Sequence, residues 1–291
     1  MDKARKSSGG RPFSGGFRAF LGDWRAFLGM FRMRLIGGMQ YRAAAWAGIA
    51  TQFFWGFVRL SVLLAFFDGS TADPGMTYGQ LASYIWLQQA TIALLLMWNQ
   101  DNDLLLSIQD GTVAYEFCRP VGLYGFWFAR LLGARLASLA LRVAPITVIA
   151  FLLPAPYGLA LPPSLGAAAL FAASLSLSAL LVTAYSMFVY ILTFVTLSSR
   201  GGILTLFAAG VIFLSGATIP IPLMPDGLRR VLELLPFRYL SDFPLRLYSG
   251  HVAGIEAAQG FAVQLAWLLA LVALGAWALG RVQKRLIVQG G

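Results

Sequence analysis

Charged residues are scarce in this sequence. Lys, Arg, Asp and Glu make up 12% of its 291 residues, whereas 58% are hydrophobic and the mean hydropathy is +0.72. Soluble domains carry roughly 25% charged residues. The composition therefore excludes an ordinary soluble domain and predicts an integral membrane protein.

Residues that build catalytic or metal centres are also rare. The single cysteine, Cys118, excludes an internal disulfide and a thiolate cluster for zinc or iron–sulfur. The single histidine, His251, lies in a predicted loop, and no His, Ser, Asp or Glu cluster has the spacing of a membrane transferase or protease. The phosphate-binding pattern GxxxxGK[ST] is absent as well. We expect no enzyme activity, no cofactor and no metal site in this chain.

Acidic residues are missing from the middle of the apolar segments. Proton-coupled carriers usually keep a carboxylate there, so an ion-coupled secondary transporter is disfavoured. An ion-coupled secondary transporter nevertheless stays open as one possible function. A non-transporting membrane assembly protein is another.

Basic residues give the chain a net charge of +10 and concentrate near its two ends, beside apolar runs. This distribution is typical of membrane orientation, so we expect the lipid bilayer and not nucleic acid as a partner. Residues 1–16 are predicted to be a disordered basic cytoplasmic tail without a signal peptide.

Residues 17–36 predict an amphipathic helix. Large apolar residues such as Trp24 and Phe31 recur at helical spacing, and three arginines lie seven residues apart on the opposite face: Arg18, Arg25 and Arg32. Such a helix suits the anionic surface of the cytoplasmic leaflet. A helix packed in a soluble domain is the alternative.

Six apolar segments are long enough to be membrane spans, since a bilayer core takes about 20 helical residues. They cover approximately residues 43–67, 80–98, 124–153, 165–197, 203–219 and 257–280. The N-terminal region, the 198–202 turn and the C-terminus carry bases, whereas loops 68–79 and 154–164 carry none. By the positive-inside rule, both termini are cytoplasmic. We predict an all-α transmembrane domain of six helices over residues 37–286.

The polar stretch 99–122, between the second and third spans, contains its own helix signals. Asp101 or Asn102 can cap a helix, and Gly111 can end it in a left-handed conformation. One face would be apolar and would consist of Leu104, Leu105 and Ile108. We expect a short cytoplasmic helix at the membrane surface that a partner can bind; an ordinary loop is the alternative.

The region after the fifth span is broken by Pro220, Pro222 and Pro225, which prevent a helix from continuing. Residues 228–237 then place apolar side chains, including Leu232, on one helical face. Short half-helices that re-enter the outer leaflet fit this pattern, and their non-helical backbone must be buried or line a wet cavity. An extracellular loop is the alternative.

Two arginines, Arg59 and Arg142, lie inside apolar spans, where an unpaired charge is costly. Their side chains can extend to the nearer interface. The alternative is contact with a substrate or with a second chain.

Two of these stretches, IQDGTVAYEFCRP (108–120) and SGATIPIPLMPDGLRRVLELLPFRYL (215–240), occur in this order within six spans. Together they resemble the permease subunits of ABC-2-type ABC transporters, in particular six-span permeases that often work as pairs. The resemblance covers about residues 38–286.

The resemblance implies a bacterial inner-membrane exporter in which a separate dimer of ATP-binding subunits holds ATP and magnesium. Residues 101–109 would be the coupling helix in a cleft of that dimer, and residues 17–36 the connecting helix. The coupling residues would be Asp101, Asp103, Leu104, Leu105, Ile108, Gly111, Arg119 and Pro120. The aromatic and aliphatic composition suits an amphipathic or hydrophobic substrate.

Small residues at four-residue spacing predict close helix packing in two spans. They are Ala168, Ala172 and Ser176 in the fourth span, and Gly133 and Ala137 in the third. We expect two permease chains, identical or paralogous, with the transport path between them.

Overall fold

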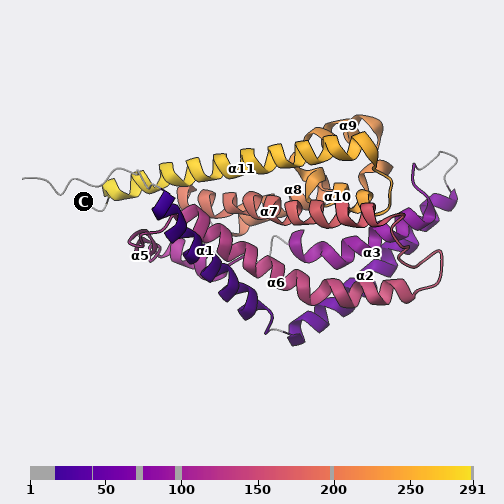
Figure 1. Cartoon of the computed structure of the whole chain (residues 1–291), viewed down its shortest axis with the longest axis horizontal. Helices are drawn as coiled ribbons and strands as arrows, with labels where there is room; N and C mark the ends of the chain where they lie inside the picture. The colour runs from indigo at the N-terminus through magenta and orange to yellow at the C-terminus, as the bar shows by residue number, and fades with distance from the viewer. Residues whose placement is uncertain (1–16, 41, 70–74, 96–99, 197–199, 290–291) are drawn as a thin grey trace, which may run out of the picture.

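A computed structural model describes residues 17–40, 42–69, 75–95, 100–196 and 200–289, and these residues form helices and no strand. The long helices α6 (Leu123–Leu152), α7 (Leu165–Thr196) and α11 (Gly254–Gln289) run along the long axis of the molecule, and α2 (Arg42–Gly69) crosses it obliquely (Figure 1). The short helix α5 (Ala114–Phe117) lies at the same end of that axis as the last turns of α11. The molecule therefore has two distinct ends joined by long helices.

Four helices are long and apolar enough to cross a bilayer. They are α2 (Arg42–Gly69), α6 (Leu123–Leu152), α7 (Leu165–Thr196) and α11 (Gly254–Gln289). Each begins within three residues of a start expected from the sequence. These four helices make the chain a membrane-embedded protein.

The two other predicted spans also form helices. The apolar helix α8 (Arg200–Leu214) has 15 residues. At 1.5 Å per residue it extends about 22 Å, less than the bilayer core of about 30 Å. The helix α3 (Tyr78–Leu95) has 18 residues and carries several polar side chains. The six-span arrangement therefore stays a prediction.

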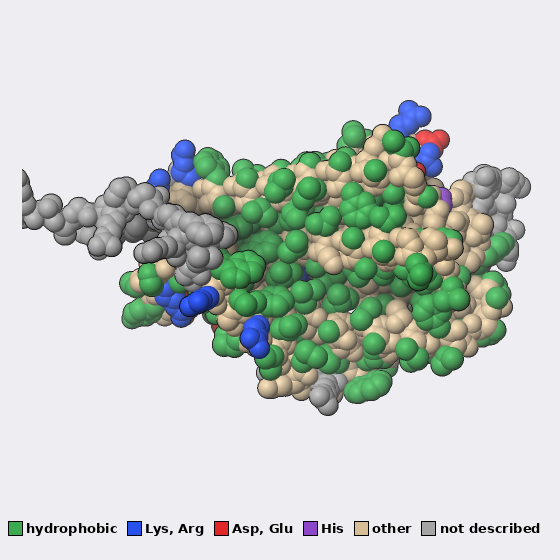
Figure 2. All heavy atoms as spheres, in the orientation of Figure 1, with side chains coloured by type: hydrophobic (Ala, Val, Ile, Leu, Met, Phe, Trp, Pro, Cys, Tyr) green, Lys and Arg blue, Asp and Glu red, His purple; other side chains and the backbone are tan. Residues whose placement is uncertain are grey.

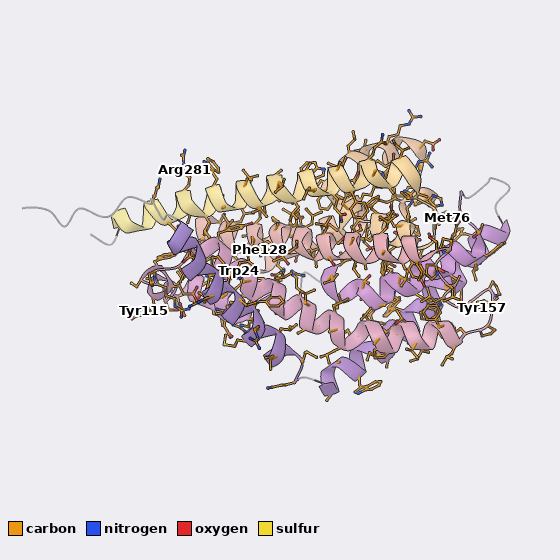
Figure 3. All side chains as sticks on the ribbon, in the orientation of Figure 1. Trp24, Met76, Tyr115, Phe128, Tyr157 and Arg281 are labelled. Carbon is orange, nitrogen blue, oxygen red and sulfur yellow. The ribbon has the colours of Figure 1, made fainter. Side chains whose placement is uncertain are left out.

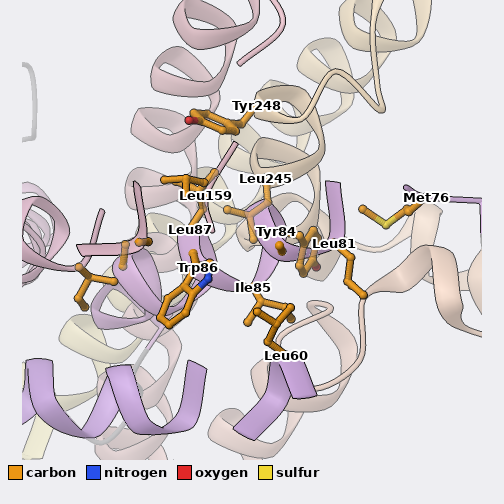
Figure 4. Close-up of a cluster of buried hydrophobic side chains, with 14 of the residues drawn as sticks. Leu60, Met76, Leu81, Tyr84, Ile85, Trp86, Leu87, Leu159, Leu245 and Tyr248 are labelled. Carbon is orange, nitrogen blue, oxygen red and sulfur yellow. The ribbon is translucent and has the colours of Figure 1, made fainter. Parts of the chain in front are cut away.

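Polar residues in α3 are explained by its central position. Every residue from Leu81 to Thr91 is buried, because α2, α6 and α10 (Asp242–Tyr248) pack around this helix. Figure 4 shows Trp86 and Tyr84 within the resulting core cluster. The Trp86 indole nitrogen donates a hydrogen bond of 2.6 Å to the carbonyl oxygen of Tyr157. Because α3 is surrounded by protein, its polar side chains need hydrogen-bond partners within the protein more than α3 needs an apolar surface toward lipid.

The predicted amphipathic helix forms α1 (Phe17–Gly38) and packs along α6. The Phe27 ring lies so close to Gly125 that a Cβ there would meet it at 2.6 Å. Trp24 and Leu28, two residues of the predicted apolar face, stay 57% and 44% exposed. One side of α1 therefore packs against α6, while apolar side chains on another side stay exposed on the protein surface.

Short helices follow α8 in place of a continuous span. They are η1 (Ile221–Leu223), α9 (Asp226–Leu234), η2 (Pro236–Leu240) and α10 (Asp242–Tyr248). Helix α8 ends before the prolines, at Leu214, and Gly216 then adopts a φ of +78°. Glycine favours this left-handed conformation. The helix therefore ends at the Ser215–Gly216 turn, and Pro220 and Pro225 act later, as the N-cap residues of η1 and α9.

Within this segment Leu232 is 1% exposed, since protein already covers it. Its burial therefore does not distinguish a re-entrant helix from a packed one.

Charged and uncharged side chains occupy different parts of the molecular surface along the long axis. In Figure 2, Lys and Arg side chains gather near the two ends, while the face between them is mainly green and tan, hydrophobic or uncharged. Long helices with charged ends and an uncharged middle suit a bilayer whose normal runs along this axis.

Candidate functional site

The predicted helix in the 99–122 stretch forms α4 (Asn102–Gln109). Asp101 is its N-cap residue: its Oδ1 accepts a hydrogen bond of 3.0 Å from the backbone N–H of Leu104. Gly111 follows the helix with a φ of +80°. Both capping predictions are confirmed, because each rests on local backbone chemistry.

The apolar face of α4 is buried within this chain. Leu104, Leu105 and Ile108 are 1%, 0% and 3% exposed, in a cluster with side chains of α6 and α7. The expectation that these three residues bury in a partner's cleft is therefore wrong. An aliphatic face beside apolar spans is covered by the nearest apolar surface, which here belongs to the same chain.

The opposite side of α4 is available to a partner. It exposes polar and acidic residues together with Leu106, which is 49% exposed, and it continues to Tyr115 on α5, which is 78% exposed. Tyr115 lies at the end of the molecule opposite Tyr157 (Figure 3). We call this surface the α4–α5 face; it comprises Asp103, Leu106, Gln109, Asp110 and Tyr115.

Asp101 does not belong to this face, because its carboxylate points inward. The Arg130 guanidinium donates two hydrogen bonds to it, from Nε to Oδ2 at 2.6 Å and from Nη2 to Oδ1 at 2.7 Å. Arg34 of α1 lies 3.1 Å from the same carboxylate, whose side chain is 6% exposed. Asp101, which the resemblance implied to be a coupling residue, is instead used within this chain, where it joins α1, α4 and α6.

Burial by itself would raise the pKa of Asp101. The hydrogen bonds and charge of Arg130, the Leu104 amide and the charge of Arg34 outweigh that effect, so the pKa lies below its ordinary value of 3.8. The carboxylate is therefore ionised at neutral pH, and the junction keeps its ion pairs.

A second carboxylate ties α5 to α6. Glu116 accepts a hydrogen bond from the Trp127 indole N–H, and one of its oxygens lies 3.6 Å from Arg130. Arg119 lies over the Phe126 ring at 5.3 Å, at the start of α6, and the neighbouring Pro120 is exposed. The run from Gly111 to Pro120 thus connects the α4–α5 face to the first turns of α6.

A cavity of about 650 Å³ lies beside the Asp101 junction, between α1, α2, α3 and α6. Its lining combines apolar residues with three arginines: Arg34, Arg135 and Arg142. Asp101 and Asp103 line it as well. Sequence reasoning singled out Arg142 alone, because the other two arginines lie nearer to predicted helix ends.

The two intramembrane arginines have different surroundings. Arg59 donates hydrogen bonds to Gln88 Oε1 at 2.8 Å and to the Ala217 carbonyl oxygen at 2.5 Å, so its charge is held inside the bundle and does not extend to an interface. Arg142 lies against Gly48, where a Cβ would meet its guanidinium at 3.1 Å. Arg142 makes no hydrogen bond or ion pair with any residue in the described part of the chain.

A charged cluster at the opposite end was missed by sequence reasoning. Asp242 is fully buried and accepts hydrogen bonds from the Tyr84 hydroxyl at 3.0 Å and from the Ile221 amide at 3.3 Å. Arg238 and Arg246 flank it at 3.7 and 3.5 Å. A signal was present: the three charges alternate at four-residue spacing, which puts them on one helical face.

No protein-family model, curated protein or solved structure matches this chain.

Proposed function

We propose that this chain is the transmembrane permease subunit of an ATP-driven ABC exporter of the ABC-2 type. In this proposal, α3 and α8 complete a six-span domain in a bacterial inner membrane, with both termini in the cytoplasm. The chain forms half of the path for an amphipathic or hydrophobic substrate and works with a second permease chain and a dimer of ATP-binding subunits.

The proposal rests on one observation. The α4–α5 face is exposed, while α4 and α5 themselves are fixed to the long helices of the chain. Asp101 and Glu116 fix α4 and α5 to Arg130 on α6, and the buried side of α4 packs on α7. Motion imposed on the exposed face is thereby transmitted to long apolar helices. A membrane protein driven by a partner's ATP hydrolysis needs this arrangement, since the sequence has no GxxxxGK[ST] loop of its own.

The structure changes which residues would contact the ATP-binding subunit. Burying an aliphatic or aromatic side chain contributes roughly 1.5–3 kcal/mol, whereas an exposed ion pair contributes only about 0–1 kcal/mol. Leu106 and Tyr115 should therefore supply most of the affinity, and Asp103 and Asp110 should mainly orient the partner.

The test compares two adjacent leucines. Leu106→Asp should leave the chain folded yet release the ATP-binding subunit or uncouple its turnover from transport, and Tyr115→Ala should weaken the same contact. Leu105→Asp should unfold the α4 region, since a charge would be buried without a partner. Asp103→Asn should have little effect. Co-purification of the ATP-binding subunit and ATP hydrolysis in lipid measure these outcomes, and normal values for both Leu106→Asp and Tyr115→Ala would refute the proposal.

A second candidate function, an ion-coupled carrier, is favoured by one observation. Asp242 is fully buried beside Tyr84, an arrangement that resembles an intramembrane carboxylate in proton-coupled carriers. Substrate transport by this chain alone in liposomes, lost in Asp242→Asn, would support the carrier. A strict requirement for the ATP-binding subunit would exclude it.

A further inference from the structure

Arg142 places a positive charge in the membrane-spanning helix α6 with no counter-charge from the described residues. The Arg142 guanidinium lies against Gly48 of α2, and Arg142 lines the same cavity of about 650 Å³ as Ser138 and Arg135. An unpaired charge among apolar helices is costly, so a ligand that neutralises it would be bound favourably.

The charge balance of the cavity leaves an excess of positive charge. Asp101 is already paired with Arg130 and Arg34, and Asp103 is exposed. Arg142 lies 12 residues beyond Arg130, about 18 Å farther along α6 at 1.5 Å per residue. The carboxylates therefore lie at one end of the cavity and Arg142 at the other.

Size and lining indicate more than an inorganic ion. Sites for drug-sized ligands occupy about 300–1,000 Å³, and a cavity of about 650 Å³ is far larger than a single phosphate group needs. Apolar walls accompany the arginines, from Ala45, Ala93, Leu131 and Leu141. On α1, which also borders the cavity, Ile36 is 57% exposed in a region suited to lipid.

We propose that this cavity binds the headgroup phosphate of an anionic phospholipid, with Arg142 as its principal ligand. A guanidinium donates paired hydrogen bonds to phosphate oxygens. Arg135 lies seven residues before Arg142 on α6, nearer to the Asp101 junction. The apolar walls receive the first part of the acyl chains. The bound lipid would bridge α2 and α6. This site is independent of any coupling to an ATP-binding subunit.

The test uses the full chain purified in detergent and stripped of lipid. Native mass spectrometry and thermal unfolding are measured with dioleoylphosphatidylglycerol, with dioleoylphosphatidylcholine and with inorganic phosphate. We expect tight binding and a raised Tm with phosphatidylglycerol only. Arg142→Gln should weaken that binding at least tenfold. Equal retention of phosphatidylcholine, or equal protection by inorganic phosphate, would overturn the assignment.

Matched variants separate binding from folding. Arg281→Gln removes an exposed arginine that lies 5.0 Å over the Trp277 ring near the end of α11, and it should keep phosphatidylglycerol binding within twofold. Ser138→Phe fills the cavity without changing its charge and should abolish binding. Without lipid, Arg142→Gln should have an unchanged or higher Tm, because it removes an unpaired charge. A clearly lower lipid-free Tm would show a structural role for Arg142 and overturn the proposal.

Discussion

At the scale of single residues, Asp101 joins three helices through one carboxylate. It caps α4, holds Arg130 of α6 in a two-bond contact and pairs with Arg34 of α1. Its neighbour Asp103 has the same chemistry but is exposed. Position, and not residue type, decides which of the two carboxylates stabilises the fold.

We predict that Asp101→Asn destabilises the protein by about 3 kcal/mol or more. Removing one member of a buried ion pair costs about 3–5 kcal/mol, since the remaining charge loses its compensation. Asp103→Asn, the matched control, should stay within about 0.5 kcal/mol of the parent. Thermal unfolding in detergent checks both variants. Equal stability of the two would show that the Asp101 junction does not hold the fold.

His251, away from the α4–α5 face, should make the stability of the folded protein depend on pH. Burial, followed by the charges of Arg246 and Arg238, lowers the pKa of His251 below its ordinary value of 6.5, and Glu256 only partly opposes this. Between the lowered pKa and 6.5 the unfolded chain binds more protons than the folded chain. Stability should therefore fall as the pH drops below about 6.5.

The measurement is the Tm between about pH 7.5 and about pH 5.5, the range in which an ordinary histidine titrates. We expect a decrease toward low pH in the parent and a smaller decrease in His251→Gln. The effect should be modest, because His251 is only partly buried. The same slope in both proteins would assign the pH dependence to other groups.

At the scale of elements, α9 combines a polar and an apolar side at the end opposite α5 (Figure 1). Leu232 is buried by protein, whereas Leu234 and Val231 are 74% and 55% exposed. The side chain of Asp226, at the start of the same helix, is also 74% exposed. Leu234 and Asp226 are both exposed, so labelling at these two positions can locate α9 relative to lipid.

We predict that a cysteine at Leu234 resists a membrane-impermeant maleimide, while a cysteine at Asp226 reacts rapidly. Lipid excludes the reagent from an apolar surface that enters the bilayer, although the protein leaves that surface exposed. Both variants need Cys118→Ser as background, because Cys118 is exposed. Rapid labelling at both positions would show that α9 is an extracellular segment in water.

At the scale of the whole molecule, the small-residue patterns have separate uses. Gly133 and Ala137 of α6 pack against α1. A Cβ on Gly133 would meet the Phe31 carbonyl oxygen at 2.6 Å, and a Cβ on Gly38 of α1 would meet the Ala137 Cβ at 2.6 Å. Ala172 and Ser176 of α7 stay exposed. Only the pattern on α7 is therefore available for a second chain.

We predict that the purified complex contains two permease chains that meet along α7. Ala172→Trp should reduce the fraction of paired chains in native mass spectrometry, since a bulky side chain prevents close helix approach. Leu269→Trp, at a 62% exposed position of α11, should leave pairing unchanged. A single permease chain in the parent complex would contradict the prediction.

The sequence alone determined where helices form and that the protein enters a membrane. Long apolar runs and scarce charge identify the four candidate spans, and local chemistry determines the caps of α4 at Asp101 and Gly111. These features depend on neighbouring residues, so no knowledge of distant contacts is needed.

Only the tertiary structure decided what each helical face contacts. An amphipathic pattern shows that Leu104, Leu105 and Ile108 share a face, but whether that face meets a partner or the chain's own α6 and α7 depends on residues far away in the sequence. The same holds for Asp101 with Arg130 and for Asp242 with Tyr84, whose partners lie 29 and 158 residues distant. Burial and ion pairing are set by packing in three dimensions, which periodicity along one helix does not specify.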